Sequence, residues 1–397
     1  MTSKAPAALA VALALAAGGV VPATAQAPIR IGASLSLTGT YAQPGRYQHE
    51  GYQLCEKDLN AKGGLLGRQV QFVVYDDQST PATAVRLYEK LITEDKVDAV
   101  MGPYSSAISE AIAPTTEKYE KVNVAPLAAT TSIFKREPPQ KPRKYMFMVI
   151  SPAEVYLEGL VDIAAKRGLK TISIINEDTL FPKASAKGTA DLAKKAGLQV
   201  VFQEAYPKGH ADFAALLTKV KASNADVLAA ATYFDDAVAI ARQMKDLNVN
   251  PKMFGLTVGG DIPKFHEDLK QTAEYIYGAT QWEPTLPYPG AKEFATAFQK
   301  AFNHEPSYHA AAGYAGCMIY AEGVRRAGAL GSEKVRETLL ALKMRTMFGD
   351  YQVDQDGFQV AHKSVLLQWQ DGKRVVVWPD ELANGKARFP TPTWNQR

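Results

Sequence analysis

The sequence predicts an α/β protein built as two lobes, each with a largely parallel β-sheet covered by helices. Short β-branched segments alternate with longer amphipathic segments over residues 27–280, a pattern that is typical of βαβ units. The alternation runs twice, ending first near Met148 and again near Gly278. At 397 residues, the chain is also longer than one hydrophobic core usually supports.

Hydrophobic periodicity places the expected elements in order. In the first half, strands are expected at 29–37, 70–75, 99–101 and 122–125, and helices at 47–61, 80–94 and 106–119. In the second half, strands are expected at 171–176, 199–204, 227–230 and 252–255, and helices at 154–167, 185–196, 211–222 and 234–247. The remaining chain predicts helices at 291–302, 308–327 and 333–342, then strands at 351–353, 364–370 and 374–378.

Three segments are expected to cross between the lobes and to form a hinge. They are 147–152, 277–284 and 349–357, and each joins a strand-like run to a turn that contains Pro or Gly. Several crossings imply lobes that are discontinuous in sequence. We therefore expect one lobe from 27–148 with 281–350, and the other from 149–280 with 351–397.

Residues 1–25 have the layout of a secretory signal peptide. Lys4 is followed by an apolar run and then by small residues that end at Ala25. The run is short and rich in alanine, so cleavage near Ala25 is expected, with an uncleaved membrane anchor as the alternative.

The sequence leaves the state of the two cysteines open. Cys55 and Cys317 both lie in apolar helical segments. One disulfide is possible in an oxidising compartment, but two buried free thiols are the interpretation that we favour from the sequence.

The 45 basic and 41 acidic side chains give a net charge of +4, which does not indicate a nucleic-acid partner.

No motif in the sequence predicts catalysis, a metal or a cofactor. There is no Walker loop, no dinucleotide-binding glycine pattern and no nucleophile elbow. The pairs His49-Glu50 and His266-Glu267 lack the second histidine of a zinc helix. A binding protein is therefore favoured over an enzyme. A secreted α/β enzyme remains an alternative, because catalytic groups can converge from distant positions.

Two polar turns follow expected strands and suit an anionic ligand. The first holds Tyr104, Ser105 and Ser106 before a helix, and the second holds Ala128, Ala129 and Thr130. Open α/β sheets bind ligands at the carboxyl ends of their strands. Helix N-termini there offer free N–H groups and a partial positive charge. The two turns together are therefore expected to hold one carboxylate, although ordinary helix capping also explains each turn alone.

Three blocks of the mature sequence resemble the opening of type I periplasmic binding proteins. They are residues 29–39 (IRIGASLSLTG), 58–68 (DLNAKGGLLGR) and 75–79 (YDDQS). The branched-chain amino acid (Leu/Ile/Val) receptors of ABC transporters are the most similar subfamily. The resemblance implies two Rossmann-like lobes joined by a three-segment hinge, a periplasmic location, a ligand caught by closure of the lobes and delivery to an inner-membrane ABC permease. We also expect a monomer that uses no cofactor.

By this resemblance, the turns at Ser105–Ser106 and Ala128–Thr130 hold the ligand carboxylate. The remaining site residues that the family pattern implies are Tyr41, Phe181, Tyr233 and Phe234, with Trp282 as a further aromatic candidate.

One departure from the family pattern concerns the ligand. Amino-acid receptors place an acid where this chain has Thr257, and a buried ammonium without a partner is costly. Asp235 is the candidate substitute. With the aromatic candidates, this favours an aromatic or aryl-alkanoic acid as ligand. A receptor for branched-chain or other apolar amino acids, and an amide-sensing or ligand-sensing module of the same fold, are the alternatives.

Overall fold

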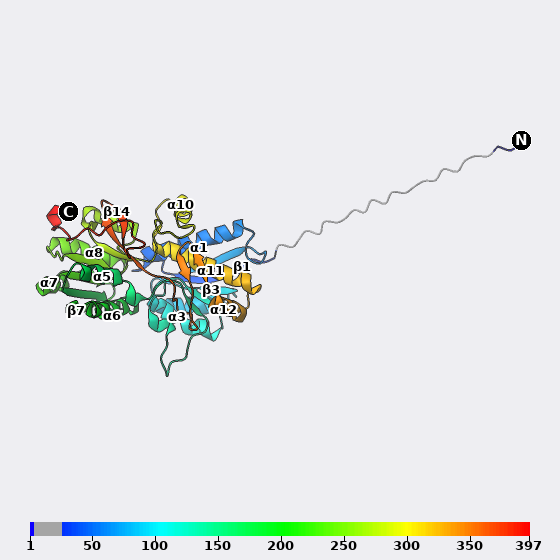
Figure 1. Cartoon of the computed structure of the whole chain (residues 1–397). Helices are drawn as coiled ribbons and strands as arrows, with labels where there is room; N and C mark the ends of the chain where they lie inside the picture. Colours follow the sequence, from blue (N-terminus) through cyan, green and yellow to red (C-terminus); the bar gives the residue numbers. More distant parts are fainter. Residues whose placement is uncertain (4–25) are drawn as a thin grey trace.

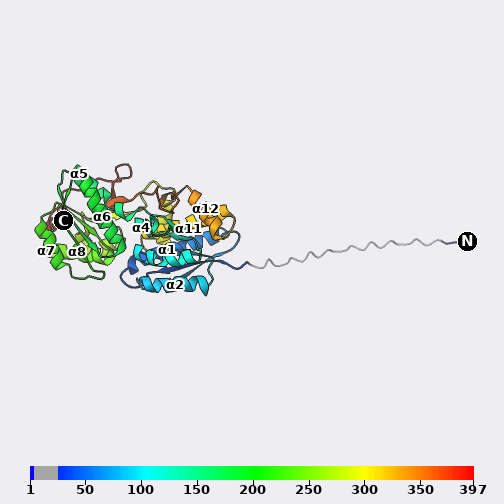
Figure 2. The same cartoon turned by 90° about the horizontal axis from the view of Figure 1, so that it is seen from below.

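The computed structural model describes residues 1–3 and 26–397. The expected apolar run of the signal peptide and the cleavage site after Ala25 lie outside the described residues. Figure 1 shows two lobes side by side, and Figure 2 shows the same separation from below, with the C-terminus on the lobe that carries α5 to α8. The predicted two-lobed α/β fold is confirmed.

The first lobe contains a fully parallel five-stranded sheet in the order β2-β1-β3-β4-β5. Its strands are β1 (Ile29–Leu35), β2 (Val70–Asp76), β3 (Ala99–Met101), β4 (Asn123–Ala125) and β5 (Met146–Met148). The helices between them are α1 (Ala42–Ala61), α2 (Pro81–Thr93), α3 (Ser106–Lys118) and α4 (Thr131–Phe134). Helix α1 starts five residues before the predicted position, because Pro44 is tolerated in a first helical turn, where its missing N–H has no partner to lose.

The second lobe contains a seven-stranded sheet in the order β14-β13-β10-β9-β8-β6-β7. The strands are β6 (Thr171–Glu177), β7 (Gln199–Tyr206), β8 (Val227–Ala231), β9 (Met253–Leu256), β10 (Tyr277–Thr280), β13 (Val365–Gln370) and β14 (Lys373–Trp378). Strands β6 to β10 are parallel, and the C-terminal hairpin β13–β14 adds antiparallel to β10. The helices are α5 (Glu158–Lys166), α6 (Leu180–Lys195), α7 (Ala214–Ser223), α8 (Phe234–Asp246) and α9 (Pro263–Leu269), with 3-10 turns at Ala153–Val155, Lys270–Ala273 and Trp394–Gln396.

The chain returns to the first lobe after β10. Helices α10 (Ala291–Phe302), α11 (Tyr308–Ala327) and α12 (Ser332–Ala341) lie there (Figure 1), followed by the small hairpin of β11 (Met344–Thr346) and β12 (Gly349–Tyr351). The sequence did not predict this hairpin. Within residues 1–3 and 26–397, no helix is long and apolar enough to cross a membrane.

Two glutamine side chains link the segments that the sequence predicts as crossings, and one of them, Gln359, lies just beyond the predicted range 349–357. Gln281 Oε1 accepts hydrogen bonds from the backbone N–H and the hydroxyl of Ser151, at 3.1 and 2.9 Å. Gln359 Nε2 donates to the carbonyl of Val149 at 3.0 Å. Both glutamines are almost fully buried, so these hydrogen bonds are shielded from water.

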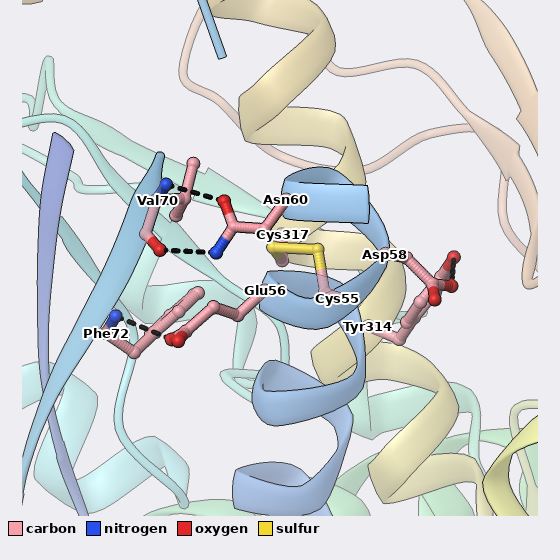
Figure 3. The surroundings of a disulfide bond; sticks show 8 residues. All are labelled: Cys55, Glu56, Asp58, Asn60, Val70, Phe72, Tyr314 and Cys317. Carbon is pink, nitrogen blue, oxygen red and sulfur yellow. Dashed lines mark hydrogen bonds between the residues drawn. A yellow bond between two sulfur atoms is a disulfide. The ribbon is translucent and has the colours of Figure 1, made fainter. Parts of the chain in front are cut away.

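The two cysteines form a disulfide, so the prediction of free thiols was wrong. The Cα atoms of Cys55 and Cys317 are 6.3 Å apart, on α1 and α11 (Figure 3). The helices approach closely because each has a glycine at the contact. A Cβ on Gly51 would lie 2.2 Å from the carbonyl oxygen of Ala310, and one on Gly313 would lie 2.8 Å from that of Gln48.

Candidate functional site

A small buried cavity lies where the strand ends of the two sheets meet. Its volume is about 10 Å³, roughly the space of one water molecule. Most of its lining follows the carboxyl ends of β3, β4, β5, β6, β8 and β9, the edge at which open α/β sheets bind ligands. The lining residues are Tyr104, Ser105, Ser106, Leu127, Ala129, Ile150, Tyr156, Phe181, Tyr233, Val258 and Tyr308. A larger hollow of about 580 Å³ lies between α5 and the C-terminal segment, but none of these strand-end turns reaches it.

The turn between β3 and α3 presents a helix N-terminus to this cavity. Ser105 is the N-cap of α3, and its hydroxyl accepts a hydrogen bond from the N–H of Ile108 at 3.3 Å. Its φ of 76° is unusual for a residue with a side chain and stores backbone strain of the kind found at ligand sites. The N–H groups of Ser106 and Ala107 have no acceptor within the helix, because they belong to its first turn.

The hydroxyl of Ser106 joins the two predicted turns. Its oxygen accepts hydrogen bonds from the backbone N–H groups of Ala129 and Thr130, at 3.1 and 3.2 Å. A serine hydroxyl can accept twice and still donate once, so the Ser106 proton is available to an anion. Ala129 lines the cavity, whereas Ala128 packs in a separate cluster with Ala113 and Met148. The Thr130 hydroxyl is buried without a hydrogen-bond partner.

Aromatic rings from both lobes fill the space beside these turns. The ring of Tyr41 lies 4.4 Å from that of Tyr233 and 5.8 Å from that of Tyr104. Phe181 lies 5.8 Å from Tyr233 and 5.1 Å from Tyr156. Since these rings pack against one another, a ligand larger than water enters only when the rings move or the lobes separate.

Seven predicted candidates are not among the residues that line the cavity. Three of them, Tyr41, Ala128 and Thr130, lie beside it as described above, and the other four are Phe234, Asp235, Thr257 and Trp282. Thr257 is fully buried, and its hydroxyl accepts from the N–H of Thr232 and donates to the carbonyl of the same residue. Phe234 is buried at the start of α8. Asp235 is exposed, so its side chain does not take the place of the missing acid. Trp282 donates to the carbonyl of Met347 in the first lobe.

A buried group of acids lies near Tyr41, and the sequence argument missed it. Glu177, at the end of β6, accepts a hydrogen bond from Thr179 at 2.6 Å and a long contact of 3.5 Å from the Tyr41 hydroxyl. Asp236 accepts from Tyr206 at 3.1 Å. Burial and the neighbouring Glu177 raise the pKa of Asp236 to about 7, and burial raises the pKa of Glu177 above its ordinary value.

One lysine of the second lobe reaches across to the first. Lys208 Nζ donates to the carbonyl of Ser79 at 2.8 Å and lies 4.0 Å from the ring centre of Tyr41. Ser79 in turn accepts a hydrogen bond from the Tyr41 N–H at 3.0 Å. Lys208 therefore contacts the segment that positions Tyr41. Among residues 1–3 and 26–397, no group of three or more His, Cys, Asp or Glu side chains could hold a metal ion.

Two lobes whose sheets meet at their strand ends around a small cavity are the arrangement of a solute-binding protein. The model of the periplasmic binding protein family matches residues 28–374, and the chain belongs to that family. It is a periplasmic solute-binding protein and not an enzyme.

Relatives and solved structures agree with this assignment. The chain is 26% identical to Leu/Ile/Val-binding protein homolog 7 of Brucella suis biovar 1 (strain 1330), over 96% of this chain and 98% of the relative. The fold is similar to a branched-chain amino acid transporter substrate binding protein from Streptococcus pneumoniae in complex with isoleucine, with a TM-score of 0.79, 24% identity and coverage of 89% and 100%. It is also similar to a solute binding protein from R. palustris in complex with benzoate, with a TM-score of 0.78, 19% identity and coverage of 88% and 95%.

Proposed function

We propose that this chain captures a small carboxylate, an aromatic or aryl-alkanoic acid, between its lobes and delivers it to an inner-membrane ABC permease. The observation that carries the proposal is the junction at Ser106, where the N-terminus of α3 meets the turn at Ala129 beside a cluster of aromatic rings. The acid's carboxylate accepts from the Ser106 hydroxyl and from the first-turn N–H groups of α3. Its apolar body lies among Tyr104, Phe181 and Tyr233.

Closure of the lobes accompanies binding in this proposal. The residues that contact the acid come from both lobes, so the full set of contacts forms only in the closed arrangement, and the ligand shifts the population toward it. We propose that residues 27–148 with 281–350 and residues 149–280 with 351–397 are the moving lobes. We further propose that the protein acts as a monomer after cleavage near Ala25.

A receptor for branched-chain or other apolar amino acids is the second candidate. The names of the Brucella relative and of the ligand in the S. pneumoniae structure favour it. The benzoate in the R. palustris structure favours the aryl acid. A thermal-shift screen of residues 26–397 separates the two. Stabilisation by benzoate or 3-phenylpropanoate supports the aryl acid, and stabilisation by leucine or valine alone contradicts it.

Replacing Ser106 tests where the carboxylate binds. Ser106→Ala removes a charge-assisted hydrogen bond to the acid, so we expect calorimetric affinity for the best acid of the screen to fall about 10- to 100-fold. Ser109→Ala is the matched control, because Ser109 is also buried on α3 and its hydroxyl has no hydrogen-bond partner. Equal affinity of the Ser106 and Ser109 variants would remove the α3 turn from the site.

A further inference from the structure

Two buried carboxyl side chains of the second lobe face the first lobe and lie outside the proposed ligand cavity. Glu177 ends β6 and is 1% exposed, and Asp236 lies in the first turn of α8 and is 6% exposed. Neither is among the residues that line the cavity. Tyr41 of the first lobe lies against them. Its hydroxyl is 3.5 Å from Glu177 Oε1, and the charges of both acids contribute to the rise in its pKa, which burial dominates. The two acids therefore lie at the contact between the lobes.

Glu177 and Asp236 are also hydrogen-bonding neighbours of each other. A bond between two carboxyl groups needs a proton on one of them, because an ionised carboxylate only accepts. Their other side-chain partners are uncharged. Thr179 donates its hydroxyl proton to Glu177 at 2.6 Å, and Tyr206 donates to Asp236 at 3.1 Å. Since two adjacent buried carboxylates do not readily both ionise, this pair of acids holds one shared proton in the closed arrangement.

The charges around the two acids do not replace that proton. Lys208 lowers the pKa of Glu177, but burial raises it more, and the ammonium of Lys208 donates to a backbone carbonyl of the first lobe. Asp235, the exposed neighbour on α8, raises the pKa of Asp236, whereas the backbone N–H of Tyr233 lowers it. Burial and the charge of Glu177 are the largest effects, so the pKa of Asp236 rises to about 7.

Separation of the lobes would expose the two acids. The contacts of Tyr41 with Glu177 and of Lys208 with Ser79 both join the lobes, so they are lost when the cleft opens. Water then reaches Glu177, and the pKa of a carboxyl falls toward its ordinary value when water replaces buried surroundings. Lys208 also leaves Asp77 of the first lobe, whose charge acts on it in the closed arrangement. The open form therefore binds the shared proton less tightly than the closed form does.

We propose that closure of the lobes over the solute takes up a proton, which Glu177 and Asp236 then share. The inference rests on the closure that the proposed function includes, but not on the identity of the solute. Because the closed form has the higher affinity for the proton, solute affinity is greatest at low pH and falls as the pH rises toward about 7. Above about pH 7 both forms have lost the proton, and solute affinity is constant. Mild acid thus strengthens capture although neither carboxyl lines the cavity.

Titration calorimetry on residues 26–397 counts the proton. The probes are 3-phenylpropanoate and leucine, whose carboxylates are ionised at pH 6. At pH 6.0 each titration is repeated in MES and in Bis-Tris, because their different ionisation enthalpies convert a proton taken from the buffer into a difference in measured heat. We expect uptake of about 0.3–0.9 proton per solute at pH 6.0 and less than about 0.1 at pH 8.5. Affinity should fall about three- to twentyfold between pH 5.5 and 7.5.

Two variants identify the group that takes up the proton. Asp236→Asn puts an amide donor where the protonated carboxyl stands. We expect its uptake to fall below about 0.1 proton and its affinity to be the same from pH 5.5 to 7.5, at the level that the unsubstituted protein reaches only at pH 5.5. A merely structural role would not produce this gain of affinity at pH 7.5. Glu177→Gln should reduce the uptake by about half or more. Asp246→Asn, an exposed acid of α8, is the matched control and should keep the full uptake.

Four results would overturn the inference. A probe that binds with an uptake below about 0.1 proton at pH 6.0 overturns it and leaves the proposed function standing. Uptake that persists unchanged in both variants assigns the proton to another group. An Asp236 variant that binds more weakly by one factor at every pH, while melting at the temperature of the control, indicates a steric role alone. If neither probe binds, the proposed carboxylate function fails together with the inference, so the two failures can be told apart.

Discussion

At the scale of single residues, two neighbouring acids at the start of α8 differ in their exposure to solvent. Asp235 is exposed, whereas Asp236 is buried and bonded to Tyr206. The helical pattern contains this distinction, because Asp236 lies four residues before the buried Ile240 and so shares its face. Asp236 is therefore the acid of this pair that lies near Tyr41. The helical period of α8 would have predicted that Asp236, and not Asp235, is buried.

The raised pKa of Asp236 predicts a pH-dependent stability. Its folded pKa of about 7 exceeds the ordinary 3.8, so between these values the folded state keeps a proton that the unfolded state releases. The contribution of Asp236 to the free energy of unfolding therefore falls as the pH rises from about 4 to 7, and it is constant above pH 7. We expect Asp236→Asn to gain stability relative to the unsubstituted protein across that interval, by at most about 4 kcal/mol.

Urea unfolding at pH 4.5, 6.0 and 7.5 measures this gain. Asp246→Asn, an exposed acid of the same helix, should stay within about 0.5 kcal/mol at each pH. A difference between the Asp236 variant and the unsubstituted protein that is the same at all three pH values would contradict the assignment.

Among the elements, the pair α1 and α11 shows what one sequence can and cannot predict. Both helices were expected, but their contact joins residues 262 positions apart, and no local pattern gives that pairing. One signal was present. Gly51 precedes Cys55 by four residues, and Gly313 precedes Cys317 by four, so each helix has a small residue and a cysteine on one face. The strand-end turns were easier to predict, because a general rule places ligands there.

The disulfide between these helices should contribute strongly to stability. It closes a long loop, and such cross-links typically stabilise by about 2–5 kcal/mol. We expect the double variant Cys55→Ala, Cys317→Ala to lose stability in that range in urea unfolding and to keep its affinity for the ligand. A loss below about 0.5 kcal/mol would show that the packing of α1 against α11, and not the bond, holds the helices together.

At the scale of the whole molecule, the proposed closure would depend on contacts that span the lobes. Gln281 and Gln359 form hydrogen bonds at the proposed hinge, and on the cleft side Lys208 contacts Ser79 and Tyr41. The sequence predicted the polar turns of the first lobe, and its three crossings stay a prediction. It did not indicate Lys208, because this side chain acts on partners in the other lobe and only the folded chain brings them together.

Removing the Lys208 contact should weaken ligand binding without affecting the fold. One interlobe hydrogen bond at a partly exposed site contributes about 0.5–1.5 kcal/mol, so Lys208→Met should lower affinity about two- to tenfold, mainly by faster dissociation. Stopped-flow fluorescence measures that rate. Lys219→Met is the control, because Lys219 pairs with Glu204 within the second lobe. Identical dissociation rates for the two variants would show that Lys208 does not hold the closed form.

A crystal structure of residues 26–397 with the best acid of the thermal-shift screen tests the central claim most directly. The proposal predicts the acid between the lobes, with its carboxylate about 3 Å from the Ser106 hydroxyl and the first-turn N–H groups of α3, and its body among Tyr104, Phe181 and Tyr233. A carboxylate bound only to the second lobe, or an acid held in the hollow between α5 and the C-terminal segment, would contradict it.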